Sequence, residues 1–202
     1  MKRFLFVMLM FAMVSSGCDA QREVKEDVVD LSAFEVMQKA INLCSDDIAS
    51  IGDMLHNTTR IQGDEEILEA LENIKEVALP YADVALKNSG LTESDVLEIL
   101  EECEISVEYF DANLVGMSML LGMLQTPSTR SITWDTYKNC FLDATGLVVG
   151  AEVVGALALK TLSKSAVKSL LKTVAKESLK KAVPWVGLLV IGAEMGYCLY
   201  VS

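Results

Sequence analysis

The chain has 202 residues and is acidic, with 29 Asp and Glu against 17 Lys and Arg, a net charge of -12. Residues 19–130 carry 24 acidic and 7 basic residues, a net of -17, whereas residues 131–202 carry 5 and 8, a net of +3. The acidic part would repel phosphates, which argues against nucleic acid as a partner. Three prolines, twelve glycines and 51% hydrophobic residues favour helices, and the length suffices for one domain or two small ones.

The first eighteen residues have the pattern of a bacterial secretion signal. Two basic residues, Lys2 and Arg3, precede an apolar run from Phe4 to Val14, and Ser15-Ser16-Gly17 leads to Cys18. A charged start, an apolar stretch of this length and small residues before the cleavage point are typical of a signal that is removed. The segment resembles the signal peptide and lipobox of bacterial lipoproteins.

This resemblance implies that residues 1–17 are removed, that Cys18 carries lipid and that residues 18–29 form a tether. The expected location is the bacterial cell envelope, on the periplasmic or surface face of a membrane that the Cys18 lipid binds. Ser15 replaces the large aliphatic residue usual three places before the cysteine, so secretion without lipid stays open as the alternative. The apolar run is well short of the ~20 residues that a bilayer span needs.

Residues 30–125 are predicted to form an acidic bundle of three helices. Apolar residues recur at alternating steps of three and four over residues 31–56, 64–88 and 92–124, as in helices that share a core. Pro80 is expected to kink or split the second helix. Thr92 and Asp95 form a variant of the capping box at the start of the third. The glutamates of the third helix lie outside its apolar face, so a solvated acidic surface is expected there.

Residues 131–202 are predicted to form an apolar and basic helical hairpin. Its segments are 133–159, 163–183 and 184–201, and a lysine recurs at every fourth position from 160 to 180. The charge balance changes sign near 125–131, which marks the predicted domain boundary. The fold class is therefore all-α, a bundle of about six helices in which the two parts can share one core.

Glycines in the last third raise a question about membranes. Gly146-x-x-x-Gly150 and Gly192-x-x-x-Gly196 match the spacing of closely packed membrane helices. Residues 184–201 are just under the length of a span. With the basic helix between them, these segments loosely resemble the glycine-rich helical hairpins of bacteriocins and pore-forming toxins. We favour the alternative, a buried hairpin that uses glycine for close packing.

Four cysteines remain besides Cys18, and an even number outside the cytoplasm predicts two disulfides. Cys44 and Cys103 lie at similar heights in the first and third helices, so Cys44–Cys103 is the preferred bridge. The remaining pair, Cys140–Cys198, is doubtful because a plain hairpin separates these residues by ~20 Å, unless a helix breaks at one of the glycines. Buried free thiols are the alternative. No CxxC motif supports a redox site or a zinc knuckle.

Glu152 and Glu194 each lie in the middle of an apolar segment. An isolated ionised carboxylate is costly there, so it should pair with a lysine, take up a proton or face water. A salt bridge to the lysine-rich helix is the first expectation. The alternative is a protonation switch that lets these helices enter a bilayer.

No motif predicts a catalytic, cofactor or metal site, because the chain has one histidine and no nucleophile elbow, Walker loop, dinucleotide fingerprint or HExxH. We therefore expect no enzyme and no cofactor. The expected function is that of a lipid-anchored envelope protein that binds an unidentified protein partner or has a structural role. A membrane-active effector acting through residues 131–202 is the second hypothesis, and an enzyme the third, for which nothing positive speaks.

Overall fold

The computed structural model describes residues 28–57, 64–125, 133–147, 161–181 and 183–202. These residues are 85% helical and form eight α-helices, which confirms the all-α class. The signal pattern with Cys18, most of the predicted boundary at 125–131 and Glu152 lie outside the described residues.

The first predicted helix is divided into shorter pieces. A strand, β1 (Val28–Asp30), leads into a 3-10 helix, η1 (Leu31–Val36), followed by α2 (Met37–Leu43) and α3 (Ser45–Asn57). The Asp30 carboxylate caps η1 by accepting a hydrogen bond from the Ser32 N–H at 2.9 Å. Most of the predicted apolar face is buried, including Phe34, Met37, Cys44, Ile48 and Ile51, while Ile41 and Leu55 are partly buried.

The second predicted helix is present as α4 (Asp64–Ser89), which continues through Pro80 and is not split there. Its apolar face is buried, with Ile67, Leu71, Ile74, Ala78 and Ala85 at most 5% exposed. The helix ends before Gly90, whose φ of +86° lies in the left-handed region that favours glycine. The stop predicted at Ser89-Gly90 is thus confirmed.

The third predicted helix is wrong as a continuous element. The structure has α5 (Glu93–Glu102), then a 3-10 turn, η2 (Val107–Tyr109), and α6 (Phe110–Leu124). Between α5 and η2 the chain reverses at Glu104, a non-glycine residue with φ +58°. Cys103 and Ile105 are both buried, and residues two apart lie about 200° apart around a straight helix. The break lets both side chains reach the core.

The last third begins with α7 (Trp134–Thr145), which ends at Gly146 with φ +72°. Gly146 therefore caps a helix, and the prediction of one continuous helix over 133–159 is wrong at this residue. Gly150 and the rest of that range from 148 on lie outside the described residues. The chain is described again from β2 (Thr161–Ser163), which pairs antiparallel with β1. There follow α9 (Lys164–Ser178), a 3-10 turn, η3 (Pro184–Val186), and α10 (Gly187–Val201).

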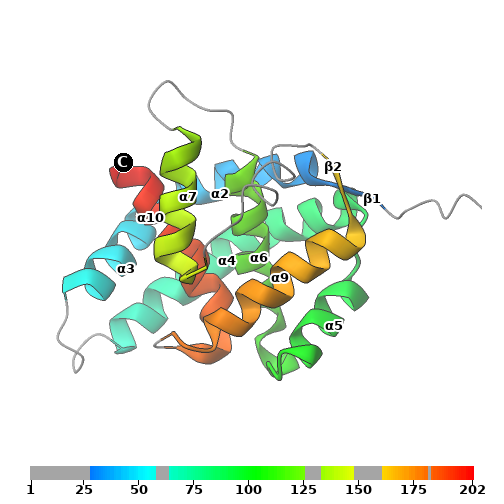
Figure 1. The fold of residues 1–202 in the computed structure, drawn as a ribbon. Helices are drawn as coiled ribbons and strands as arrows, with labels where there is room; N and C mark the ends of the chain where they lie inside the picture. Colours follow the sequence, from blue (N-terminus) through cyan, green and yellow to red (C-terminus); the bar gives the residue numbers. More distant parts are fainter. Residues whose placement is uncertain (1–27, 58–63, 126–132, 148–160, 182) are drawn as a thin grey trace, which may run out of the picture.

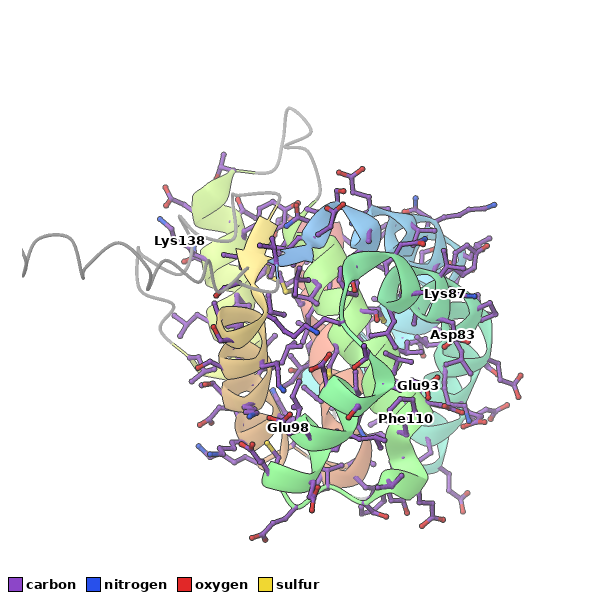
Figure 2. All side chains as sticks on the ribbon, turned by 90° about the vertical axis from the view of Figure 1, so that its right-hand side faces the viewer. Asp83, Lys87, Glu93, Glu98, Phe110 and Lys138 are labelled. Carbon is purple, nitrogen blue, oxygen red and sulfur yellow. A yellow bond between two sulfur atoms is a disulfide. The ribbon has the colours of Figure 1, made fainter. Side chains whose placement is uncertain are left out.

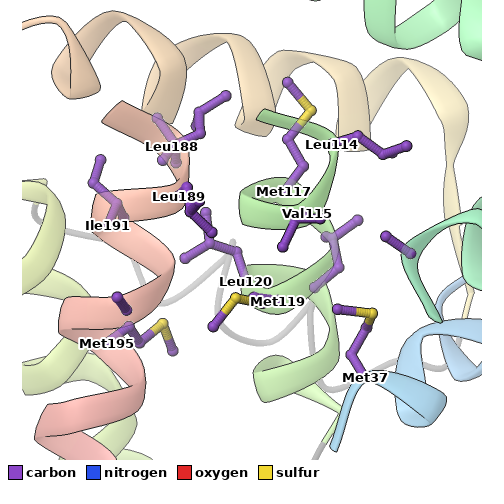
Figure 3. Close-up of a cluster of buried hydrophobic side chains, with 14 of the residues drawn as sticks. Met37, Leu114, Val115, Met117, Met119, Leu120, Leu188, Leu189, Ile191 and Met195 are labelled. Carbon is purple, nitrogen blue, oxygen red and sulfur yellow. The ribbon is translucent and has the colours of Figure 1, made fainter. Parts of the chain in front are cut away.

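Two apolar helices, α6 and α10, pack against each other at the centre of the fold. Helices α3, α7 and α9 pack against α10, while α4 and η1 pack against α6 (Figure 1). Every residue of α6 from Ala112 to Leu124 is buried. Side chains such as Met119, Leu120 and Leu189 fill the space between the two helices (Figure 3). The acidic region and the C-terminal region thus share one hydrophobic core.

Glycine brings the two central helices into backbone contact. A Cβ atom on Gly116 of α6 would lie 2.3 Å from the carbonyl carbon of Leu188 and 2.4 Å from the nitrogen of Leu189. Gly192 of α10 lies on the same interface, with Met119 and Gly116 as its nearest neighbours. The close packing that we favoured therefore joins α10 to α6.

Candidate functional site

The most highly charged interface among the described helices lies between α5 and α9. Lys164, Lys168 and Lys172 of α9 face Asp95, Glu98 and Glu102 of α5, and Glu98 lies between the two helices (Figure 2). The Nζ–carboxylate distances include 3.2 Å for Lys164–Asp95, 3.3 Å for Lys168–Asp95, 3.2 Å for Lys172–Glu98 and 2.7 Å for Lys172–Glu102.

The spacing of the lysines along α9 matches the spacing of the acidic residues along α5, because both follow the repeat of an α-helix. The lysines are spaced by four residues and the acids by three and four, so each row runs along one side of its helix. We call Lys164, Lys168 and Lys172 the lysine row. The sequence shows the row itself. The glutamates Glu98 and Glu102 are exposed, as expected for a solvated acidic surface, but they also pair with lysines of α9, which the sequence analysis did not predict.

The contacts across this interface shift several pKa values towards the charged form, those of Asp95, Lys168 and Lys172 among them. Hydrogen bonds to Glu98 and Glu102 raise the pKa values of Lys168 and Lys172, respectively. Burial raises the pKa of Asp95, but hydrogen bonds from Thr92, Lys164 and Lys168 outweigh it and lower the pKa to about 2. Thr92 and Asp95 form the predicted capping box at the start of α5, which is confirmed.

Replacement of Asp95 by Asn should flatten the acid limb of the stability curve. The folded-state pKa of about 2 lies below the ordinary value of 3.8. This group therefore contributes stability that is complete above pH 3.8 and is lost as the pH falls towards 2. Urea unfolding at several pH values should show this loss in the wild type and a smaller one in the variant. Asp83→Asn, on the exposed face of α4, is the matched control, and a flattening as large as that of Asp95→Asn would contradict the assignment.

A disulfide between Cys140 and Cys198 joins α7 to α10, with the Cα atoms 5.5 Å apart. The pair that was doubtful from the sequence is therefore the bonded one. Helix α7 ends at Gly146, and a break at a glycine was the condition under which Cys140 and Cys198 could meet. The preferred bridge, Cys44–Cys103, is wrong, since both residues are free and buried. Cys103 lies at the C-terminal end of α5, which packs on α9. Its Sγ lies 3.6 Å from the carbonyl oxygen of Lys172 in α9.

The free thiols lack the properties of nucleophiles. Burial, with a smaller contribution from Asp47, raises the pKa of Cys44 to about 11. Burial also raises the pKa of Cys103. A reactive cysteine needs a lowered pKa and access to solvent, so these two residues serve packing.

A pocket of about 360 Å³ lies beside the disulfide, between α3, α7 and α10. It is lined by Leu55, Asp143, Ala144, Glu194, Tyr197, Cys198 and Val201. The salt bridge expected for Glu194 is confirmed, because its carboxylate lies 2.5 Å from Nζ of Lys181, just beyond α9. The Tyr197 hydroxyl donates to Asp53 at 2.8 Å, and this bond raises the tyrosine pKa. The lining thus combines apolar side chains with two acidic residues, Asp143 and Glu194, of which Glu194 is neutralised by Lys181.

In the described part of the chain, the segment Pro184–Val201 is long and apolar enough to cross a membrane, and 56% of it is buried inside the protein. Length and composition alone do not separate a span from a core helix. The ends of the segment have further features of membrane-spanning helices. Lys180 and Lys181 precede it, and two aromatic residues near its ends are exposed, Trp185 by 46% and Tyr200 by 73%.

No protein-family model matches the chain, and searches of curated proteins and of solved structures find no match. Within the described residues, no group of three or more His, Cys, Asp or Glu is placed to hold a metal ion. The site is therefore interpreted from its own geometry: a lysine row that pairs with an acidic helix, a disulfide, and a pocket lined by Glu194 in a salt bridge with Lys181.

Proposed function

We propose that this chain is a lipid-anchored protein of the bacterial cell envelope with a binding or structural role. The Cys140–Cys198 disulfide carries the proposal, because structural disulfides persist in oxidising compartments outside the cytoplasm. The secretion pattern that ends at Cys18 agrees with this location. A binding role is supported by the pocket beside this disulfide, which is large enough for a small ligand and is lined by both polar and apolar side chains, among them Glu194, Tyr197 and Leu55.

Replacement of Cys18 by Ser should release the protein from the membrane. We expect the wild type to sediment with membranes until detergent is added, because the proposed lipid on Cys18 would anchor it. The variant should appear in the soluble fraction outside the cytoplasm. Cys44→Ser, which alters a buried cysteine of the folded part, is the matched control and should stay with the membrane. A wild type that is soluble without detergent would refute the lipid anchor.

The second candidate function is that of a membrane-active effector that acts through residues 131–202. The apolar helices of the C-terminal region and their packing favour it. Helix α6 is buried on nearly all sides, and α10 is largely buried from Gly187 to Gly196. Helix α10 belongs to the segment of span length that follows Lys180 and Lys181. Amphipathic helices such as α9 surround this apolar pair. Such an arrangement keeps an apolar segment that could enter a bilayer away from water until the amphipathic helices around it move away.

A further inference from the structure

We propose that the lysine row of α9 is a latent binding surface for an anionic lipid bilayer and that α5 is the cover that occupies it. The inference rests on the membrane-active function proposed above. It goes further by naming the surface, its ligand and the element that blocks it.

Helix α9 has the pattern of a helix that lies on a membrane. The lysine row follows one side, while Val167, Leu171 and Val174 form a separate apolar side that is at most 2% exposed. A basic side beside an apolar side is typical of helices that settle at the interface of anionic bilayers. The lysines are 16–22% exposed in the covered state, so a lipid surface reaches them only if α5 moves.

Helix α5 presents to α9 a row of negative charges, as the surface of an anionic bilayer would. Asp95, Glu98 and Glu102 place three carboxylates in a line against the lysine row, with contacts that include 2.7 Å and 3.2 Å. This match of charge and spacing is the observation that identifies the ligand as a surface with repeated negative charges. In the folded protein α5 is therefore an internal competitor for that surface.

The attachment of α5 allows it to act as a separate unit. It packs mainly on α9 and has fewer contacts with α6. Both of its ends adjoin residues in the left-handed region, Gly90 with φ +86° and Glu104 with φ +58°, where the chain changes direction. Its own apolar residues Val96, Ile99 and Leu100 are buried. In water these contacts keep the cover closed, and we expect it to open when a lipid surface replaces them.

A bilayer fits this region better than a nucleic acid or an acidic protein. Helix α9, which carries the lysine row, also has a buried apolar side and packs on α10, which belongs to the span-length segment Pro184–Val201. Lys180, Lys181 and Trp185 stand at the start of that segment, as at the interface end of membrane helices. A nucleic acid would engage the lysines but offers no environment for these apolar parts.

The test compares charge-neutralised variants of residues 18–202 that carry Cys18→Ser and keep the Cys140–Cys198 bond. The cover variant is Asp95→Asn/Glu98→Gln/Glu102→Gln. The control variant, Glu93→Gln/Glu101→Gln/Glu108→Gln, removes three charges from exposed positions of the same region. Sedimentation with phosphatidylglycerol–phosphatidylcholine vesicles should show at least ~10-fold stronger binding of the cover variant than of the control, with no such gain on pure phosphatidylcholine. Equal binding of the two variants would overturn the proposal.

A further variant separates exposure of the lysine row from general unfolding. It adds Lys164→Gln/Lys168→Gln/Lys172→Gln to the cover variant, which restores the wild-type net charge and should abolish the gain in binding. A gain that persists without these lysines would overturn the proposal, as would equally strong binding of the cover variant to double-stranded DNA. Release of a trapped dye tests the underlying function separately: binding without release supports the lysine row as the lipid surface and contradicts the membrane-active effector.

Discussion

Reduction of the Cys140–Cys198 bond is expected to lower the free energy of unfolding by about 4 kcal/mol. The bond joins residues 58 positions apart, and closing a loop of this length restricts the unfolded chain by roughly that amount. Urea unfolding with and without a reductant measures the effect in the wild type. The bond also fixes α7 on α10, so the loss should appear as one shift of the whole transition.

The control for this prediction is the double variant Cys140→Ser/Cys198→Ser. It should be about as unstable as the reduced wild type and should not respond to the reductant. Cys44 and Cys103 remain in that variant as free thiols. A response of the double variant as large as that of the wild type would mean that Cys44 and Cys103 form a bond in solution.

Replacement of Gly116 by Ala is expected to destabilise the protein by about 3 kcal/mol, at the upper end for overpacking a core. The added Cβ would lie 2.3–2.5 Å from three backbone atoms of Leu188 and Leu189. Backbone atoms cannot rotate away as a side chain can, so α6 and α10 must separate. Thermal or urea unfolding measures the loss.

Gly192→Ala provides the matched control at the same interface. Its Cβ would lie 3.3 Å from Met119 Cβ and 3.4 Å from the carbonyl oxygen of Gly116, distances that small shifts can accommodate. Alanine also favours a helix over glycine by about 1 kcal/mol, so the stability of this variant should lie within ~1 kcal/mol of the wild type. Equal effects of the two substitutions would contradict the close approach at Gly116.

The elements that sequence analysis predicted well are those with a sustained local pattern. The helix over 64–88 and the apolar segment 184–201 follow from periodicity and composition, and so does the buried face that contains Phe34 and Ile51. The division after Cys103 could not be predicted in this way. No glycine or proline lies at the turn, and Glu104 adopts a left-handed conformation because the core holds the residues on either side.

The cysteine pairing and the α5–α9 interface were missed for the same reason. Extending the third helix through Cys103 placed that residue beside Cys44, whereas the reversal brings α5 onto α9. Gly146 was interpreted as a packing glycine, although it ends α7 and so allows Cys140 to meet Cys198. The lysine row is visible in the sequence, but its acidic partners depend on contacts between residues about 70 positions apart.

The most direct test of this account is the mass of the protein extracted from membranes, measured after alkylation in denaturant with and without prior reduction. The account predicts an N-terminus at Cys18 that carries lipid. Alkylation should reach Cys44 and Cys103 before reduction, and Cys140 and Cys198 only after it. A chain that retains residues 1–17, a Cys18 without lipid, or a peptide in which Cys44 is bonded to Cys103 would contradict it.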